Sequence, residues 1–256
     1  MNNLALVLAS SLVILALFLS RAFRLGLEKE MLAGVGRAVI QLLVIGMLLN
    51  WVFARNRWYF TLAMIGIMVI VAGGNAARRG EGIPRVKRIT ILSIATGVAV
   101  PLLVLVLTGA IKATPKEMIP VAGMLAGNAM VASGLVLKNM KESMGQQREE
   151  IMNALYLGAT IAQSVAEIRP RIIKTGMLPT IDGLRTLGLV QLPGMMTGLI
   201  LGGVSPLVAV KYQIMVAFML LGAVSITSIM VILLALPSFF TANASLNENL
   251  LKEFGS

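Results

Sequence analysis

The fold of this chain is decided by LYLGATIAQSVAEIRPRIIKTGMLPT, residues 155–180, a polar and basic stretch with an apolar run on either side. The flanking runs lie at 118–137 and 184–203. Each is long enough to cross a membrane as a helix, which needs about 20 mostly apolar residues. The stretch is therefore expected to form a structured segment at one face of a membrane.

The composition also indicates a membrane protein. Of 256 residues, 57% are hydrophobic and 13% are charged, whereas a soluble domain has about 25% charged residues. We predict an all-α integral membrane protein with about seven transmembrane helices, of which the sixth contains Arg185, Gln191 and Pro193. The predicted spans are 3–20, 31–53, 58–77, 90–109, 118–137, 184–203 and 207–236.

The basic residues are distributed unevenly between the predicted loops. Most of them follow spans one, three and five, and by the positive-inside rule these loops lie in the cytoplasm. We therefore expect the chain in the inner (plasma) membrane, with its N-terminus outside and its C-terminus in the cytoplasm. The net charge of +11 then reflects orientation, and no nucleic acid is expected as a partner. These loops carry Arg21, Arg24, Lys29, Arg78, Arg79, Arg85, Lys87, Arg88, Lys138, Lys141, Arg148, Arg169, Arg171 and Lys174.

Two domains are predicted from this arrangement. A polytopic transmembrane domain covers 1–237, and its only sizeable loop is the cytoplasmic segment 138–183. The polar residues 238–256 are expected to form a flexible cytoplasmic tail.

Enzymatic functions are largely excluded by the residue types present. The chain has no Cys and no His, and Asp182 is its only aspartate. This removes thiol and imidazole catalysis, most zinc, copper and haem sites, and a paired-aspartate protease. No GxxxxGK[ST] phosphate-binding loop occurs. We predict a protein that is not an enzyme, binds no cofactor itself and has no defined metal site.

Small and polar residues within the spans suggest helix contacts and a transport route. The glycine pairs Gly123–Gly127 and Gly194–Gly198 have GxxxG spacing, which allows close helix packing or a dimer contact. Polar side chains in spans either bond between helices or line a wet path. Asp182 and Arg185, at i and i+3, are expected to form an ion pair. The candidate path residues are Gln41, Asn128, Gln191, Met195, Met196 and Gln213.

Residues 147–173 contain clear helix boundary signals. A helix is predicted over 147–157, with Gly158 at the left-handed position that ends it. Thr160 and Gln163 fit a capping box that starts a short second helix, and Pro170 fits the first turn of a third element. The short helix is expected to present an apolar stripe to a protein groove, or to lipid headgroups. This stripe consists of Ile161, Ala162, Val165 and Ala166.

The same segment resembles the EAA loop of ABC-transporter permeases, which docks onto an ATPase subunit. The matching positions include Gly158, Gln163 and the pair Leu178–Pro179, whereas Met152-Asn153-Ala154 replaces the leading Glu-Ala-Ala. Nearly the whole chain is also similar to the FetB family of iron-export permeases. That similarity is carried by VGRAVIQLLVIG (35–46), MIPVAGMLAGNAMVASGL (118–135) and GLVQLPGMMTGLILGGVSPLVAVKYQIMVAFMLL (188–221).

This resemblance implies a permease homodimer that binds two copies of a separate ATPase, which holds ATP and Mg. It implies iron as the exported cargo, with UDP-glucose or another organic or chelated cargo as the alternative. An ATPase-independent secondary transporter or channel is a second alternative, and Pro193 beside Gly194 would be the helix break expected there. The implied ATPase-coupling residues are Leu155, Gly158, Ala159, Thr160, Ala162, Gln163 and Val165.

Overall fold

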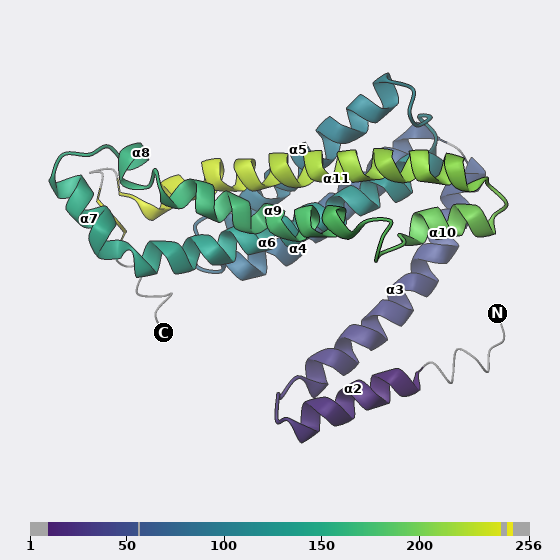
Figure 1. Ribbon diagram of the computed structural model, residues 1–256, viewed down its shortest axis with the longest axis horizontal. Coiled ribbons are helices and arrows are strands. Elements are labelled where there is room, and N and C mark those ends of the chain that lie inside the picture. Colours follow the sequence, from purple (N-terminus) through teal and green to yellow (C-terminus); the bar gives the residue numbers. More distant parts are fainter. Residues whose placement is uncertain (1–9, 56, 242–244, 248–256) are drawn as a thin grey trace. The chain divides into compact units, whose positions relative to one another are not determined.

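The computed structural model describes residues 10–55, 57–241 and 245–247, and no strand forms within them. The chain divides into two compact units, 1–56 and 57–256, which are described separately below (Figure 1). The helices are α2 (Ser11–Ala22), α3 (Glu28–Arg55), α4 (Trp58–Ala77), η1 (Arg78–Gly80), α5 (Val86–Leu107), α6 (Pro115–Gln146), α7 (Arg148–Tyr156), α8 (Ile161–Ser164), α9 (Ile168–Thr186), α10 (Gly194–Leu201), α11 (Pro206–Ala235) and η2 (Leu236–Phe239).

The first unit consists of α2 and α3. Ser20 at the end of α2 donates a hydrogen bond from Oγ to Oε1 of Glu28 at the start of α3, at 2.9 Å. None of the most apolar window of α3 is buried within the chain, so lipid or another protein must cover this helix. The predicted span 3–20 is described only from residue 10. Its helix, Ser11–Ala22, has 12 residues, which is shorter than a membrane crossing.

The second unit is a bundle in which α4, α5, α6 and α11 pack along one another (Figure 1). Small residues permit the close contacts. A side chain at Gly73 of α4 would collide with Ile91 of α5, and one at Gly97 of α5 would collide with Thr227 of α11. Apolar side chains from all four helices fill the middle of the bundle. This cluster includes Val69, Ala72, Ile94, Val98, Leu125, Ala129, Val216 and Ala223.

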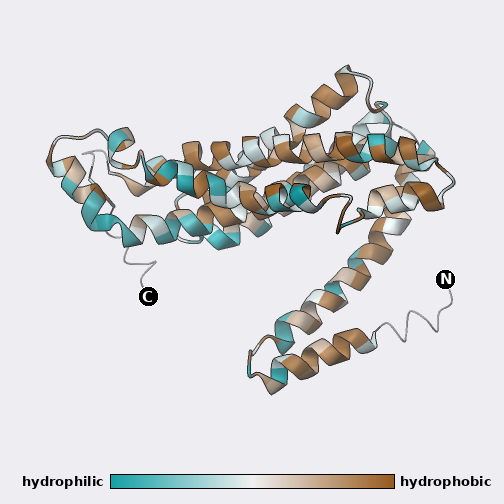
Figure 2. Ribbon diagram, viewed as in Figure 1, coloured by the Kyte–Doolittle hydropathy of each residue, from teal (hydrophilic) through white to brown (hydrophobic). Residues whose placement is uncertain are grey.

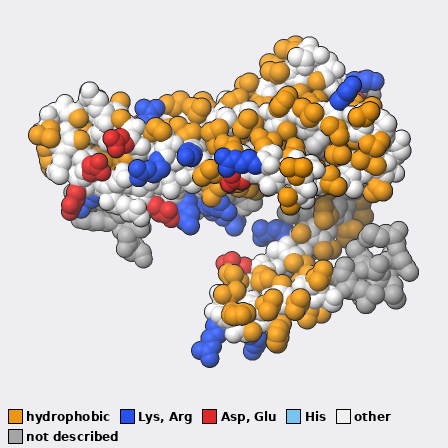
Figure 3. Space-filling view, in the orientation of Figure 1, with side chains coloured by type: hydrophobic (Ala, Val, Ile, Leu, Met, Phe, Trp, Pro, Cys, Tyr) orange, Lys and Arg blue, Asp and Glu red, His pale blue; other side chains and the backbone are white. Residues whose placement is uncertain are grey.

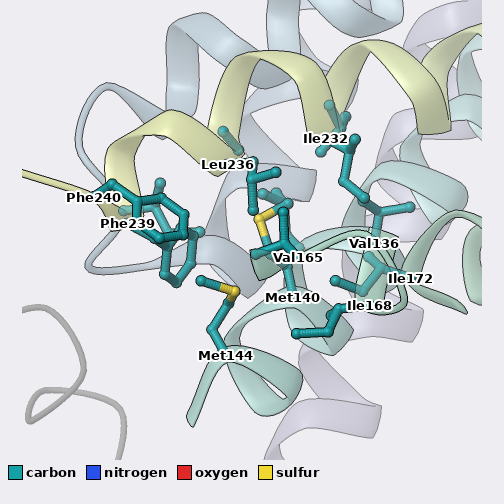
Figure 4. Close-up of a cluster of buried hydrophobic side chains, with 14 of the residues drawn as sticks. Val136, Met140, Met144, Val165, Ile168, Ile172, Ile232, Leu236, Phe239 and Phe240 are labelled. Atoms are coloured by element: carbon teal, nitrogen blue, oxygen red, sulfur yellow. The ribbon is translucent and has the colours of Figure 1, made fainter. Parts of the chain in front are cut away.

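A second apolar cluster, here called the end cluster, lies at the end of the bundle next to α7 and α8 (Figure 4). It joins α6, α9 and α11 to the residues that follow α11. Phe239 and Phe240 of the predicted flexible tail are buried in it, as is Leu246. The described part of the tail is therefore packed, because its aromatic side chains gain an apolar environment there. The end cluster includes Val136, Met140, Met144, Val165, Ile168, Ile172, Ile232, Leu236, Phe239 and Phe240.

Across the described residues, five helices are long and apolar enough to cross a membrane. They are α3, α4 with η1, α5, α6, and α11 with η2. The prediction of one continuous sixth span at 184–203 is wrong. In this range α9 ends at Thr186 and the eight-residue α10 begins at Gly194. Gly188 between them has a φ of +81°, and Pro193 has no N–H to continue a helix.

The segment 138–183, predicted as a loop that contains short helices, is helical over most of its length. Helix α6 continues to Gln146, about 13 Å beyond the predicted end of its span at residue 137. Helices α7 and α8 follow, and α9 then packs back along α6 and α11. Figure 2 shows that the end of the unit formed by α7 and α8 is its most hydrophilic part. The segment is thus a set of packed helices that extends the bundle.

Candidate functional site

The connection between α7 and α8 has a defined backbone geometry. Gly158 has a φ of +90°. Its N–H donates to the carbonyl of Leu155 and the N–H of Ala159 donates to the carbonyl of Ala154, each at 3.0 Å. This pair of bonds is a Schellman motif, which ends a helix on a left-handed residue. The predicted helix end is confirmed. It requires a left-handed backbone conformation, which Gly158 adopts without the steric cost of a Cβ.

Helix α8 begins with the predicted capping box. The N–H of Gln163 donates to Thr160 Oγ1 at 3.3 Å, and the N–H of Thr160 donates to Gln163 Oε1 at 2.8 Å. Each residue thereby satisfies a donor of the other. Pro170 lies in the first turn of α9, also as predicted. Two short helices are therefore held at a fixed angle by bonds within residues 154–163.

The surface of this connection differs from the predicted apolar stripe. Val165 is fully buried in the end cluster, and Ile161 and Leu155 pack against the same cluster. The exposed large apolar side chains are instead Tyr156 and Leu157, at 78% and 89%. Ala159 is half-buried, whereas Ala162 and Gln163 are exposed. Helix α8 ends at Ser164, so Val165 and Ala166 lie beyond it and the four predicted residues do not form one helical stripe. Which of them faces the protein depends on packing with α6 and α9.

A shallow groove continues from α8 along the outward face of α9. Its volume is about 580 Å³. Figure 3, compared with Figure 1, shows Lys and Arg side chains spaced along this part of the surface. The groove combines an apolar floor with basic groups. It is lined by Ala162, Ala166, Arg169, Pro170, Ile173, Lys174, Met177 and Ile181.

The predicted ion pair lies further along α9. Arg185 Nη1 is 2.9 Å from Asp182 Oδ1. The two side chains are nevertheless 71% and 59% exposed within the single chain. An exposed pair contributes at most about 1 kcal/mol to stability, so its value to the fold is small.

The candidate path residues do not gather at one place. Asn128 on α6 is half-buried and donates from Nδ2 to the Met124 carbonyl of its own helix, at 2.9 Å. Gln191 is exposed in the segment between α9 and α10, and Gln41 is exposed on α3 of the other unit. Gln213 on α11 is buried, and its Oε1 has no hydrogen-bond partner among the described residues.

A cavity of about 420 Å³ brings Met195 of α10 together with α6 and α11. It lies at the end of the bundle opposite α7 and α8. Three Met side chains surround it, and Met196 is not among its lining residues. The lining consists of Ile111, Lys116, Glu117, Pro120, Val121, Met124, Met195, Leu199, Tyr212 and Met215.

The two predicted GxxxG pairs contribute little to packing inside one chain. A Cβ at Gly123 would lie 3.8 Å from Met68 of α4. At Gly127, Gly194 and Gly198 a Cβ would meet no described atom within 4 Å. The close helix contacts use Gly73, Gly97 and Gly176 instead. The signal in the sequence for the contact at Gly97 was another small residue, Ser93, four positions before it.

Comparison with known proteins places the chain in a family. The uncharacterised protein family UPF0014 matches residues 3–240. No solved structure matches. The chain is 39% identical to the protein named probable iron export permease protein FetB of Escherichia coli (strain K12), over 98% of this chain and 97% of that protein.

Two plant proteins are similarly related. The chain is 43% identical to the UPF0014 membrane protein STAR2 of Oryza sativa subsp. japonica, over 94% of this chain and 85% of that protein. It is 41% identical to the protein ALUMINUM SENSITIVE 3 of Arabidopsis thaliana, over 90% of this chain and 84% of that protein. With its apolar helices of spanning length and these near full-length matches, the chain is a multi-pass membrane protein that belongs to the family UPF0014.

Proposed function

We propose that the chain is the membrane permease subunit of an ABC transporter whose ATP is hydrolysed by a separate ATPase subunit. The observation that carries this proposal is the α7–α8 connection, an ordered and polar end of the bundle that exposes Tyr156 and Leu157. Paired apolar side chains on a rigid projection suit a protein groove better than water. The connection would lie in the cytoplasm. Four described helices of spanning length precede it, so an N-terminus outside additionally requires that the predicted span 3–20 crosses the membrane.

The packing around the connection supports a coupling role. Val165, directly after α8, is buried beside Ile168 and Ile172 of α9 in the end cluster. The same cluster contains Met140 of α6 and Ile232 of α11. Because packed interiors deform little, a displacement of α8 would be passed to α6, α9 and α11 together. A hinge motion of the ATPase pair could thus change access to the transport route.

A second copy of the chain completes the proposed transporter. Helix α10 is exposed along Gly194 and Gly198, and Gly127 of α6 is also exposed. Small exposed residues allow helix backbones to approach one another in lipid. We assign these glycines to the contact between the two permease copies, each of which would hold one ATPase.

Iron is the leading cargo in this proposal, because a relative at 39% identity is named as an iron export permease. The cavity of Met124, Met195 and Met215 offers thioether sulfur and apolar surface, which also suits a chelated or organic cargo. The break between α9 and α10 favours one further candidate, a secondary transporter, since such proteins use broken helices. Dependence of transport on the ATPase separates the two.

Replacement of both Tyr156 and Leu157 by Ser is expected to weaken ATPase binding at least about tenfold, which corresponds to 1.4 kcal/mol. The reason is loss of the two apolar side chains exposed at the connection. The measurement is titration of the purified ATPase onto the permease in nanodiscs.

Leu201→Ser is the matched control, since this side chain is 83% exposed at the end of α10. It should leave ATPase affinity unchanged. Equal affinity of the double variant and the wild type would remove the connection as the docking site.

A further inference from the structure

The depth of the Asp182–Arg185 pair follows from the packing of α9. Gly176 lies against Ala132 and Val136 of α6, and a Cβ there would be 2.5 Å from Val136 Cγ2. Helix α9 runs antiparallel to α6, because α7 and α8 form the return between them. Asp182 and Arg185 are six and nine residues beyond Gly176, a rise of about 9 and 13 Å.

This rise places the pair beside the middle of α6. Because α9 is antiparallel to α6, a position six to nine residues after Gly176 on α9 is level with a position six to nine residues before Ala132–Val136 on α6. The pair therefore lies roughly at the level of residues 125–128. The uncharged stretch of α6 is bounded by Glu117 and Lys138, so its midpoint is close to Asn128. The pair is therefore at about half the depth of the membrane-spanning bundle.

Lipid is an unsuitable environment for this face of α9. A charged side chain at the centre of a bilayer costs about 2.5–3.5 kcal/mol or more. The segment 187–193 next to it is not helical, and such backbone is tolerated at membrane depth only inside protein or beside water. By contrast, most exposed residues of α4 and α5 are apolar, among them Ile67 and Leu103, and Asn75 of α4 is the polar exception on α4 within the membrane-spanning part of the bundle.

A dry contact with a second copy is also unsuitable. The outward face of α9 carries Arg171 and Lys174 in addition to the ion pair. The chain has 22 basic and 11 acidic residues, so an identical copy facing this surface would bring further positive charge. Burying ion pairs and unpaired charge costs several kcal/mol. Water is the environment that these charges can share.

We infer that the outward face of α9, from Arg169 to Thr186, is the water-filled wall of the transport path, and that the Asp182–Arg185 pair is its polar contact for cargo at mid-depth. This inference rests on the proposed permease function and adds the position of the route. The cargo class that it implies is a polar or charged solute. The route follows the outward face of α9, and the exposed apolar residues of α4 and α5 contact lipid.

Single cysteines test the inference, since the chain has no native Cys. Met177→Cys, Ile181→Cys and Thr186→Cys report on α9 and leave both members of the ion pair in place. Ile67→Cys on α4 and Leu103→Cys on α5 are controls on exposed, apolar helix faces within the membrane-spanning bundle. The full-length chain in proteoliposomes is treated with a membrane-impermeant, charged methanethiosulfonate, and each labelling rate is compared with complete labelling after unfolding in dodecyl sulfate.

The α9 thiols are expected to react about 100-fold faster than the controls, since a thiol in lipid has a raised pKa and little thiolate. Rates on α9 as slow as those at Ile67→Cys and Leu103→Cys would overturn the inference. The assay contains no ATPase and no cargo. Its failure would leave ATPase docking intact, and failure to bind an ATPase would leave the labelling result standing.

Discussion

A Gly158→Arg chain is expected to fold and reach the membrane but to lose its ATPase and all ATP-driven transport. No described atom lies within 4 Å of a Cβ at this position, so the side chain meets no steric barrier. It does occupy the surface next to Tyr156 and Leu157. The left-handed φ of +90° also becomes unfavourable by about 1–2 kcal/mol for a residue with a Cβ. Co-purification with the ATPase measures the loss.

Gly203→Arg provides a closely matched control. Gly203 has a φ of +88° and ends α10 through the same pair of backbone bonds, to Ile200 and Leu199. Its Cβ would also meet open space within the described residues. The backbone cost is therefore similar, but the position is remote from the α7–α8 connection. Loss of ATPase binding in both variants would indicate a general defect. Retention of ATPase binding by Gly158→Arg would exclude a coupling role for the α7–α8 connection.

Gly176→Leu is expected to unfold or strongly destabilise the second unit. A Cβ at this position would lie 2.5 Å from Val136 Cγ2, 2.8 Å from Ser228 Oγ and 3.2 Å from the Ala132 carbonyl. Overpacking of such a contact costs about 1–3 kcal/mol, and the carbonyl cannot rotate away. The midpoint of thermal unfolding in detergent should fall, and α9 should separate from α6 and α11.

Gly183→Leu, on the same helix, is the comparison. Its Cβ would meet no atom of the described chain within 4 Å, and Leu is a better helix former than Gly. We expect an unchanged or slightly higher unfolding midpoint. An equal fall for both variants would mean that helix α9 is sensitive to any leucine and that the Gly176 contact is not specific.

Local signals in the sequence were sufficient to predict the helix boundaries of the connection. Gly158, Thr160 and Gln163 act through bonds to residues within five positions, so no knowledge of the bundle was needed. The same applies to the Asp182–Arg185 pair, whose partners are one helical turn apart. Apolar runs likewise predicted α4, α5, α6 and α11, because length and hydropathy are properties of each segment alone.

Features that depend on distant segments were not predictable. The inward orientation of Val165 is fixed by α6 and α9, and the burial of Phe239 by the end cluster. The close contact at Gly176 involves two helices about 40 and 50 residues away in sequence. The depth of Asp182 in the bundle could be found only from the register between α9 and α6. The hydropathy of 184–203 indicated one span, since a short break hardly changes an average over 20 residues.

Transport in proteoliposomes tests the central claim most directly. Vesicles contain the chain with its ATPase facing the outer solution, and either iron(II) or UDP-glucose is added outside with Mg-ATP. We predict uptake of one cargo that requires both ATP hydrolysis and the ATPase, persists in Gly203→Arg and is absent in Gly158→Arg. Equal uptake without the ATPase, or full uptake by Gly158→Arg, would contradict the account.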